Sequence, residues 1–175
     1  MDYDLLQVLR ESAIANVKVS NIYKKMDRDY YNGNRYFTYA LLLQNNKIYV
    51  GDTSNIYSRL MSHFEMSESS AKWVKLHGPV KRVLEITYDA SPGAENERTL
   101  EYADIFGWEN VRGGYHCMLE LTKPPSSLEN FKRGQMKHNF MQRDEIRQIE
   151  LDIRAIVAEK IDNRVLPGID NNINI

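Results

Sequence analysis

Residues 36–51 read YFTYALLLQNNKIYVG, and this segment predicts a β-hairpin. Its first part, 36–43, is rich in aromatic and aliphatic residues, as is typical of a buried strand. Gln44-Asn45-Asn46 predicts the turn, and residues 47–50 predict the return strand, which ends at Gly51. Two antiparallel strands joined in this way would place Tyr39 and Tyr49 side by side.

Helical spacing follows directly after the hairpin. Asp52-Thr53-Ser54 supplies candidates for a helix N-cap, and Ile56, Leu60 and Phe64 recur at the period of a helix. A second helix is predicted over 70–76 and a third strand over 80–88, separated by Gly78-Pro79. The sequence therefore predicts a strand-turn-strand unit, two helices and one further strand.

Two more helices are predicted toward the C-terminus. One covers 92–106, with Ser91 as its cap, Pro92 in its first position and Gly107 as its stop. Apolar residues at helical spacing then predict a long helix, for which packing against the domain and a dimer seam are both open: Ile146, Ile149, Ile153, Ile156, Val157 and Ile161.

Composition bounds the class of protein. The 175 residues are 42% hydrophobic, which suits one globular core, and the net charge of −1 argues against a general nucleic-acid coat protein. No apolar run is long enough to span a bilayer, and the acidic start does not resemble a signal peptide. The single cysteine, Cys117, cannot form an internal disulfide. We therefore expect an intracellular protein, cytoplasmic or nuclear.

Side chains suited to phosphodiester chemistry follow the hairpin. Arg59 lies in the helix after Tyr49, and His63 follows it by four residues, on the same helix face. An arginine suits the negative charge that develops on a phosphate, because its charge is permanent and its fork matches phosphate oxygens. A tyrosine can take a proton from water only if its neighbours lower its pKa.

A carboxylate is expected from the helix over 92–106. At 100° per residue, Glu95 shares a face with Thr99, Tyr102 and Phe106, whereas Glu97 falls on the polar side, which has an adequate interpretation as a solvated face. A carboxylate turned toward a sheet is costly unless it is paired or binds metal. Glu95 is therefore the functional candidate.

Taken together, these segments resemble the GIY-YIG nuclease family. Thr38-Tyr39 stands at the family's first Ile-Tyr, Tyr49-Val50-Gly51 stands at its second triplet, and Arg59 and His63 follow at the expected places; Phe37 replaces the first glycine. Gly107-Trp108-Glu109-Asn110-Val111-Arg112-Gly113-Gly114 resembles the closing motif of one branch. The resemblance covers about residues 36–117.

The resemblance implies a fold class and a division of the chain. The fold would be α/β, with a small three-stranded antiparallel sheet flanked by helices. Residues 1–34 would form an N-terminal helical extension, 35–118 the nuclease-like domain, and 119–175 a linker and a long helix.

The resemblance also implies roles for individual residues. Tyr49 would be the general base, with Tyr39 assisting it, Arg59 would stabilise the transition state, and His63 would relay a proton or hold phosphate. One Mg²⁺ or Mn²⁺ would be bound by Glu95, and a two-residue shift of the alignment makes Glu97 the other candidate.

Four further residues are candidates for contact with nucleic acid. Lys72 and Lys75 lie on either a solvated surface or a surface that meets backbone phosphates. Asn110 would order the site, and Arg112 would pin its loop through an ion pair with the acids or contact phosphate.

The function expected is metal-dependent endonucleolytic hydrolysis of DNA. The alternative is a catalytically inactive nucleic-acid-binding or regulatory module that keeps the fold. In a regulatory subunit the C-terminal helix would bind a second copy or another protein, and removing the residues after Pro125 would leave the rest intact.

Overall fold

The predicted hairpin is present in the computed structural model, which describes residues 36–165. Strands β1 (Phe37–Leu42) and β2 (Ile48–Thr53) pair antiparallel, with Tyr39 opposite Gly51. The turn between them contains the short helix η1 (Gln44–Asn46), in which Asn45 and Asn46 have positive φ angles. Asparagine tolerates this conformation better than most residues, which explains why the hairpin turns here.

The hairpin is the centre of a larger sheet than the sequence predicts. Strand β3 (Arg82–Tyr88) pairs antiparallel with β1, so the three-stranded antiparallel core is confirmed. The whole sheet is five-stranded and mixed, in the order β4-β2-β1-β3-β5, because β4 (Val111–Gly113) runs parallel to β2 and β5 (Asn139–Phe140) joins β3. The expectation of three antiparallel strands was wrong in this respect, since strands of three and two residues are too short to show an alternating pattern.

Helices α2 (Ile56–Glu65) and α4 (Ala94–Phe106) begin later than their sequences suggest. Strand β2 continues to Thr53, so the N-cap of α2 is Asn55, whose side chain accepts a hydrogen bond from the Ser58 N–H at 3.1 Å. Residues 91–93 form a turn before α4, in which the Ala94 N–H donates to the Ser91 carbonyl at 3.0 Å. The predicted stop at Gly107, with φ of 89°, is confirmed.

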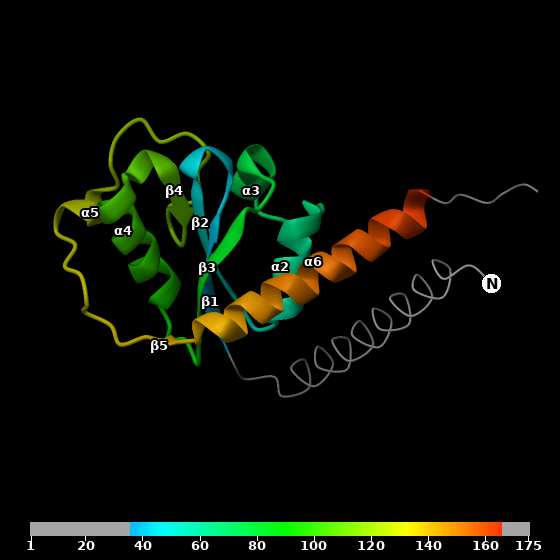
Figure 1. Ribbon diagram of the computed structural model, residues 1–175. Helices are drawn as coiled ribbons and strands as arrows, with labels where there is room; N and C mark the ends of the chain where they lie inside the picture. The colour runs from blue at the N-terminus through cyan, green and yellow to red at the C-terminus, as the bar shows by residue number, and fades with distance from the viewer. Residues whose placement is uncertain (1–35, 166–175) are drawn as a thin grey trace, which may run out of the picture.

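The sheet separates two layers of helices (Figure 1). Helix α4 covers one face, and α2 and α6 (Arg143–Val165) cover the other. The short elements α3 (Lys72–His77), η2 (Trp108–Asn110) and α5 (Ser126–Glu129) lie between the main ones in the chain. The face between the sheet and α2 is called the closed face below, and the face between the sheet and α4 the open face.

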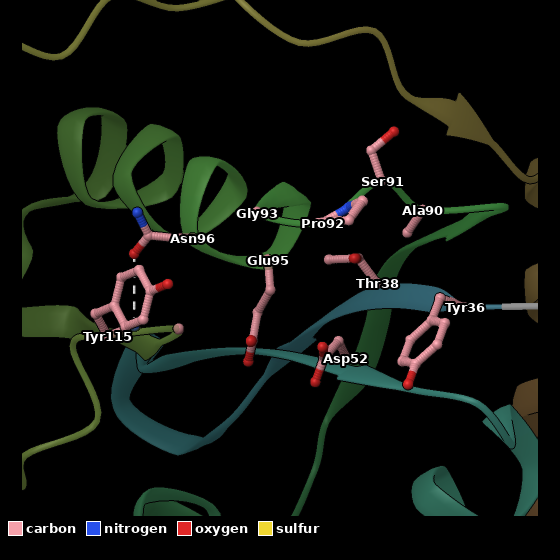
Figure 2. A pocket seen from close by; sticks show the side chains of 11 residues that line it. Tyr36, Thr38, Asp52, Ala90, Ser91, Pro92, Gly93, Glu95, Asn96 and Tyr115 are labelled. Carbon is pink, nitrogen blue, oxygen red and sulfur yellow. Dashed lines mark hydrogen bonds between the residues drawn. The ribbon is translucent and has the colours of Figure 1, made fainter.

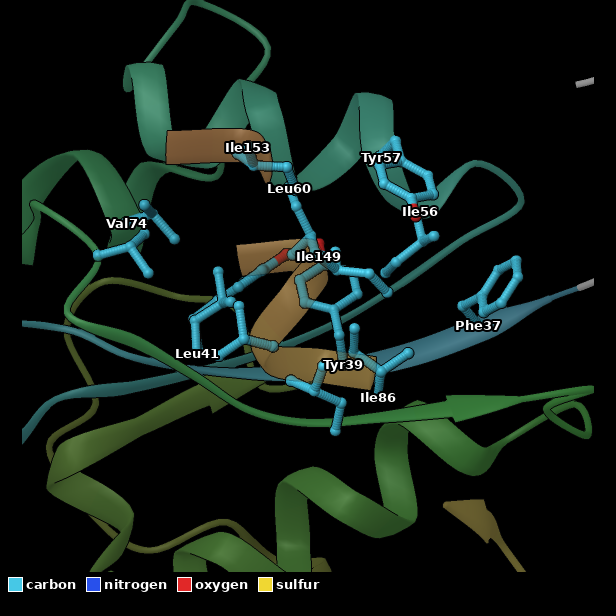
Figure 3. Close-up of a cluster of buried hydrophobic side chains, with 14 of the residues drawn as sticks. Phe37, Tyr39, Leu41, Ile56, Tyr57, Leu60, Val74, Ile86, Ile149 and Ile153 are labelled. Carbon is cyan, nitrogen blue, oxygen red and sulfur yellow. The ribbon is translucent and has the colours of Figure 1, made fainter. Parts of the chain in front are cut away.

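The main core lies on the closed face, where α2 and α6 meet β1 and β3 (Figure 3). Tyr39 and Leu41 of β1 point into it, and so do Leu60 of α2 and Ile153 of α6, all of them fully buried. The C-terminal isoleucine stripe packs against the domain through Ile146, Ile149, Ile153 and Ile156, whereas Ile161 is exposed. Packing against the domain is therefore confirmed for the first four residues of this stripe.

Helix α6 shares its core with the nuclease-like segment. The proposed boundary near residue 118 is thus a boundary in sequence, crossed by contacts of α6 with α2 and β3. The proposed helical extension over 1–34 lies outside the described residues. Within 36–165, no helix combines the length and the apolar character that crossing a membrane requires.

Candidate active site

A chain of hydrogen bonds on the closed face joins Tyr39, His63 and Ser70. The Tyr39 hydroxyl lies 2.7 Å from His63 Nε2, and His63 Nδ1 lies 2.9 Å from the Ser70 hydroxyl. Arg59 donates from Nε to the Tyr39 oxygen at 3.2 Å and from Nη1 to the Ser69 carbonyl at 2.7 Å. Because the Tyr39 oxygen accepts from Arg59, its own proton is free to go to His63, and His63 then donates from Nδ1 to Ser70.

His63 is neutral in this chain. Burial and the neighbouring Arg59 charge lower its pKa to about 3. Tyr39 and His63 are both 0% exposed, so each must satisfy its polar atoms within the protein, and the chain above does this. The α2 spacing of four residues between Arg59 and His63 is what brings both side chains to one phenol.

The two tyrosines lie close together, with ring centroids 6.3 Å apart. Burial raises the pKa of Tyr39 and of Tyr49, while the charge of Arg59 lowers both. Gly51, opposite Tyr39, leaves room for the phenol, since a Cβ at Gly51 would lie 2.4 Å from the Tyr39 oxygen. The glycine of the second triplet is therefore explained by the position of the Tyr39 hydroxyl.

From Gly51 onward, no described strand pairs with the outer edge of β2. Strand β4 pairs with β2 only from Ile48 to Val50, so among the described strands nothing covers the outer edge of β2 beyond that point. Glu95, in the first turn of α4, extends toward this edge, and its carboxylate lies near that of Asp52 (Figure 2). Burial is the largest cause of the raised pKa of Tyr39 and of Tyr49, and the charge of Glu95 adds to it in both cases.

Glu95 lines a cleft of about 500 Å³ on the open face (Figure 2). Burial and the nearby Asp52 raise the Glu95 pKa, whereas the Gly114 N–H and Arg59 lower it. The cleft is lined by residues from β1, β2, the start of α4 and the loop after β4: Tyr36, Thr38, Asp52, Ala90, Ser91, Pro92, Gly93, Glu95, Asn96, Gly114 and Tyr115.

The donors around this cleft fit one hard divalent cation. Thr38 is 1% exposed, and its hydroxyl has no hydrogen-bond partner among the described residues. Carboxylate and hydroxyl oxygens are the donors that Mg²⁺ and Mn²⁺ take. No group of three or more histidine, cysteine, aspartate and glutamate side chains within 36–165 could hold a metal.

Glu97 lies elsewhere on α4. Its carboxylate accepts a hydrogen bond from the Met136 N–H at 2.9 Å and lies 3.6 Å from His138 Nε2. The side chain is 11% exposed, so the expected solvated face is absent here, because the segment before α6 covers this side of α4. The structure brings Glu95 and not Glu97 to the cleft.

The closing-motif residues Asn110 and Arg112 hold the loop that leads to the cleft. Asn110 donates to the Phe106 carbonyl at 2.8 Å and accepts from Lys47 at 2.9 Å. Arg112, 3% exposed, donates to the carbonyls of Trp108, Val111, Met118 and Leu119 and stacks on Trp73. Its partners in the structure are thus backbone oxygens rather than the acids of the site.

Lys72 and Lys75 are exposed on α3, outside the cleft. Lys75 donates to the Glu68 carbonyl at 2.9 Å. Both remain on the surface, and neither lines the cleft with Glu95.

Asp52 and Thr38 line the cleft but are not among the sequence-based candidates. The signal for them was strand alternation: Tyr39 and Gly51 face α2, so Thr38 and Asp52, one position away and opposite each other, face α4. The signal was missed because Asp52 was interpreted as a helix cap.

One family model matches part of this chain. Residues 35–102, less than half of the chain, match the model described as the GIY-YIG catalytic domain. No curated protein matches this sequence. No solved structure matches it either. The matched segment runs from the hairpin through Arg59 and His63 to Glu95, so the similarity to a GIY-YIG catalytic domain covers the residues that meet at the edge of β2.

Proposed function

We propose that this protein is a divalent-metal-dependent endonuclease that hydrolyses phosphodiester bonds of DNA. One observation carries the proposal: four separate elements, β1, β2, α2 and α4, bring the two tyrosines, Arg59 and Glu95 to the open edge of β2. These are a permanent cation and two phenols on the closed face and a carboxylate in the cleft of the open face, and this combination suits hydrolysis of a phosphate diester.

In this proposal Tyr49 accepts a proton from the attacking water. Its raised pKa keeps it protonated at rest, so it acts only when positive charge near the phenol favours the phenolate. Arg59 supplies part of that charge and, during attack, faces the oxygens of the scissile phosphate. Removing an oriented donor of this kind typically costs about 10²–10³ in rate.

Tyr39 and His63 position Arg59 in this proposal. The Tyr39 oxygen accepts from Arg59 Nε, and neutral His63 holds the Tyr39 proton. The hydrogen bond between His63 Nδ1 and the Ser70 hydroxyl holds the imidazole in the orientation that accepts from Tyr39. These hydrogen bonds hold the guanidinium at the sheet edge, and none of the carboxylates in 36–165 forms an ion pair with it.

Glu95 would hold the Mg²⁺ or Mn²⁺ ion. When bound, such an ion withdraws charge from the phosphate and the leaving oxygen. Burial and, after it, the charge of Asp52 raise the pKa of Glu95, and a cation bound to the carboxylate would favour its charged form. DNA would lie across the cleft, where Tyr36 and the 86% exposed Tyr115 offer aromatic surfaces to bases.

A plasmid-nicking assay tests this proposal. Purified protein with Mg²⁺ or Mn²⁺ should convert supercoiled DNA to the open-circular form, whereas Arg59→Ala and Glu95→Ala should not, and EDTA should stop the reaction. Nicking by the wild type at the same rate as both variants would refute the proposal.

An inactive binding module remains the rival, and the raised pKa values of both tyrosines favour it. Gel-shift measurements on the same three proteins separate the two functions. DNA binding without metal-dependent nicking in the wild type would support the binding module.

A further inference from the structure

A second carboxylate, that of Asp52, lies on the open face. Asp52 lies directly after the Tyr49-Val50-Gly51 triplet, at the uncovered edge of β2, and lines the same cleft as Glu95. Its side chain makes no hydrogen bond or ion pair with any residue in 36–165.

Thr38 gives independent evidence for a ligand at this place. It stands directly opposite Asp52 on β1, and both side chains belong to the α4 side of the sheet. The Thr38 hydroxyl is buried and has no partner among the described residues, although it borders the cleft (Figure 2). A buried hydroxyl without a partner is costly, so its presence indicates that something polar occupies the cleft beside it.

We infer that Asp52 and Thr38 complete, with Glu95, a single divalent-cation site in which Asp52 is a second acidic ligand and Thr38 holds a water of the ion. The inference rests on the proposed function for the identity of the ion, Mg²⁺ or Mn²⁺. In the proposed function Glu95 alone holds the ion. Here Asp52 of β2 supplies a second negative charge, and Thr38 of β1 supplies a neutral oxygen.

The positions of the two carboxylates support this arrangement. Asp52 and Glu95 line the same cleft, and two like charges so placed repel each other when no cation is present. A divalent ion between them would turn this repulsion into attraction. Arg59 donates its hydrogen bonds to Tyr39 and the Ser69 carbonyl. Within the part of the chain that the structure describes, neither of the two acids forms an ion pair.

Isothermal titration of the full chain with Mn²⁺, in the absence of DNA, measures this site directly. The variants are Asp52→Asn, Thr38→Val and Glu95→Gln, and the matched control is Asp144→Asn, which removes the same charge from a groove beside α6. Asp52→Asn should weaken Mn²⁺ binding by about 10-fold or more, and Thr38→Val, which removes an outer-shell partner, by about 10-fold. The control should bind as the wild type does.

A thermal unfolding measurement without metal accompanies the titration. Thr38→Val should keep or raise the unfolding temperature, because valine removes an unsatisfied buried hydroxyl of nearly the same shape. Added Mn²⁺ should raise the unfolding temperature of the wild type and of Asp144→Asn, and much less that of Asp52→Asn.

The possible outcomes separate this inference from the nuclease proposal. If Asp52→Asn binds Mn²⁺ as tightly as Asp144→Asn, the inference is overturned, even if the wild type cuts DNA. If Mn²⁺ binding depends on both Glu95 and Asp52 but no nicking occurs, the cation site stands and the nuclease proposal falls.

Discussion

The two faces of the sheet differ in how their polar side chains are buried and hydrogen-bonded. On the closed face Tyr39 and His63 are fully buried, uncharged and joined in one hydrogen-bonded chain under α2 and α6. On the open face Glu95 and Asp52 keep carboxylates beside a cleft, next to an unpartnered hydroxyl. The difference teaches that the closed face fixes stability and orientation, whereas the open face holds the charge that a ligand would neutralise.

Removing α6 should have the largest effect, because it uncovers the closed face. Deleting residues 143–175 exposes four buried isoleucines and their partners, at about 2 kcal/mol each or about 8 kcal/mol in total, against a typical domain stability of about 5–15 kcal/mol. Urea unfolding followed by circular dichroism should show no cooperative transition. Ile161→Ala, at an exposed position of the same helix, should change the stability by less than about 0.5 kcal/mol. A truncated chain that unfolds cooperatively would instead support α6 as an appended partner-binding helix.

Arg59→Lys should lower the cutting rate and leave the fold intact. Lysine cannot donate to the Tyr39 oxygen and the Ser69 carbonyl with the planar fork of arginine, so the single-turnover cutting rate should fall by about 10²–10³ with the fold retained. Arg82→Lys, an exposed arginine of β3, is the control. A loss smaller than tenfold would remove Arg59 from the transition state.

The cutting rate should rise with pH if Tyr49 is the base. Since burial raises the Tyr49 pKa above its usual value of 10.0, the phenolate fraction should grow about tenfold per pH unit between pH 7 and 9. Rate profiles at saturating Mg²⁺ measure this slope. Tyr49→Phe should cut far more slowly and with a flat profile, and an unchanged slope in that variant would assign the base role to another group.

Gly51→Ala should displace the Tyr39 side chain and so lower both the stability and the cutting rate. The new Cβ would lie 2.4 Å from the Tyr39 oxygen, and overpacking of this kind costs about 1–3 kcal/mol. The free energy of unfolding should fall by that amount, together with the cutting rate. If the effect acts through the Tyr39 hydroxyl, then Tyr39→Phe combined with Gly51→Ala should cut no more slowly than Gly51→Ala alone. Additive losses would point to a different cause.

Acid should weaken the closed face through His63. Its pKa is about 3 in the folded protein and about 6.5 in the unfolded chain. The contribution to stability is therefore complete above pH 6.5 and is lost at about 1.4 kcal/mol per pH unit as the pH falls from 6.5 toward 3. Urea unfolding at pH 7, 6 and 5 should show this slope in the wild type and less of it in His63→Gln. Equal slopes would mean that His63 is not the group responsible.

Local patterns were enough to predict the centre of the fold. The β1–β2 hairpin, the third strand and the Arg59–His63 spacing each depend on residues close in sequence. Strands β4 and β5 were missed because their pairing depends on contacts with distant strands rather than on their own three and two residues. The choice of Glu95 from its helix face agrees with its position at the cleft, although the cover over Glu97 by the segment before α6 could not be foreseen.

The roles of Asp52 and Arg112 could not be predicted from their own segments of the sequence. Asp52 looked like a helix cap because its neighbours are small and polar, and only the extension of β2 to Thr53 assigns it to a strand. Arg112 looked like a partner for acids or phosphate, yet its loop folds back so that four backbone carbonyls reach it first. In both cases the tertiary path of the backbone decided the role.

The packing of α6 on the closed face also has a consequence for the order of events during synthesis. Residues of β1 and α2 leave the ribosome long before Ile153, so Tyr39, Leu41 and Leu60 remain uncovered until α6 emerges. Contacts between segments so far apart in sequence form late and slow the folding of a domain. We therefore expect the nascent chain to present an apolar surface to chaperones, and to orient Arg59 only after α6 has docked.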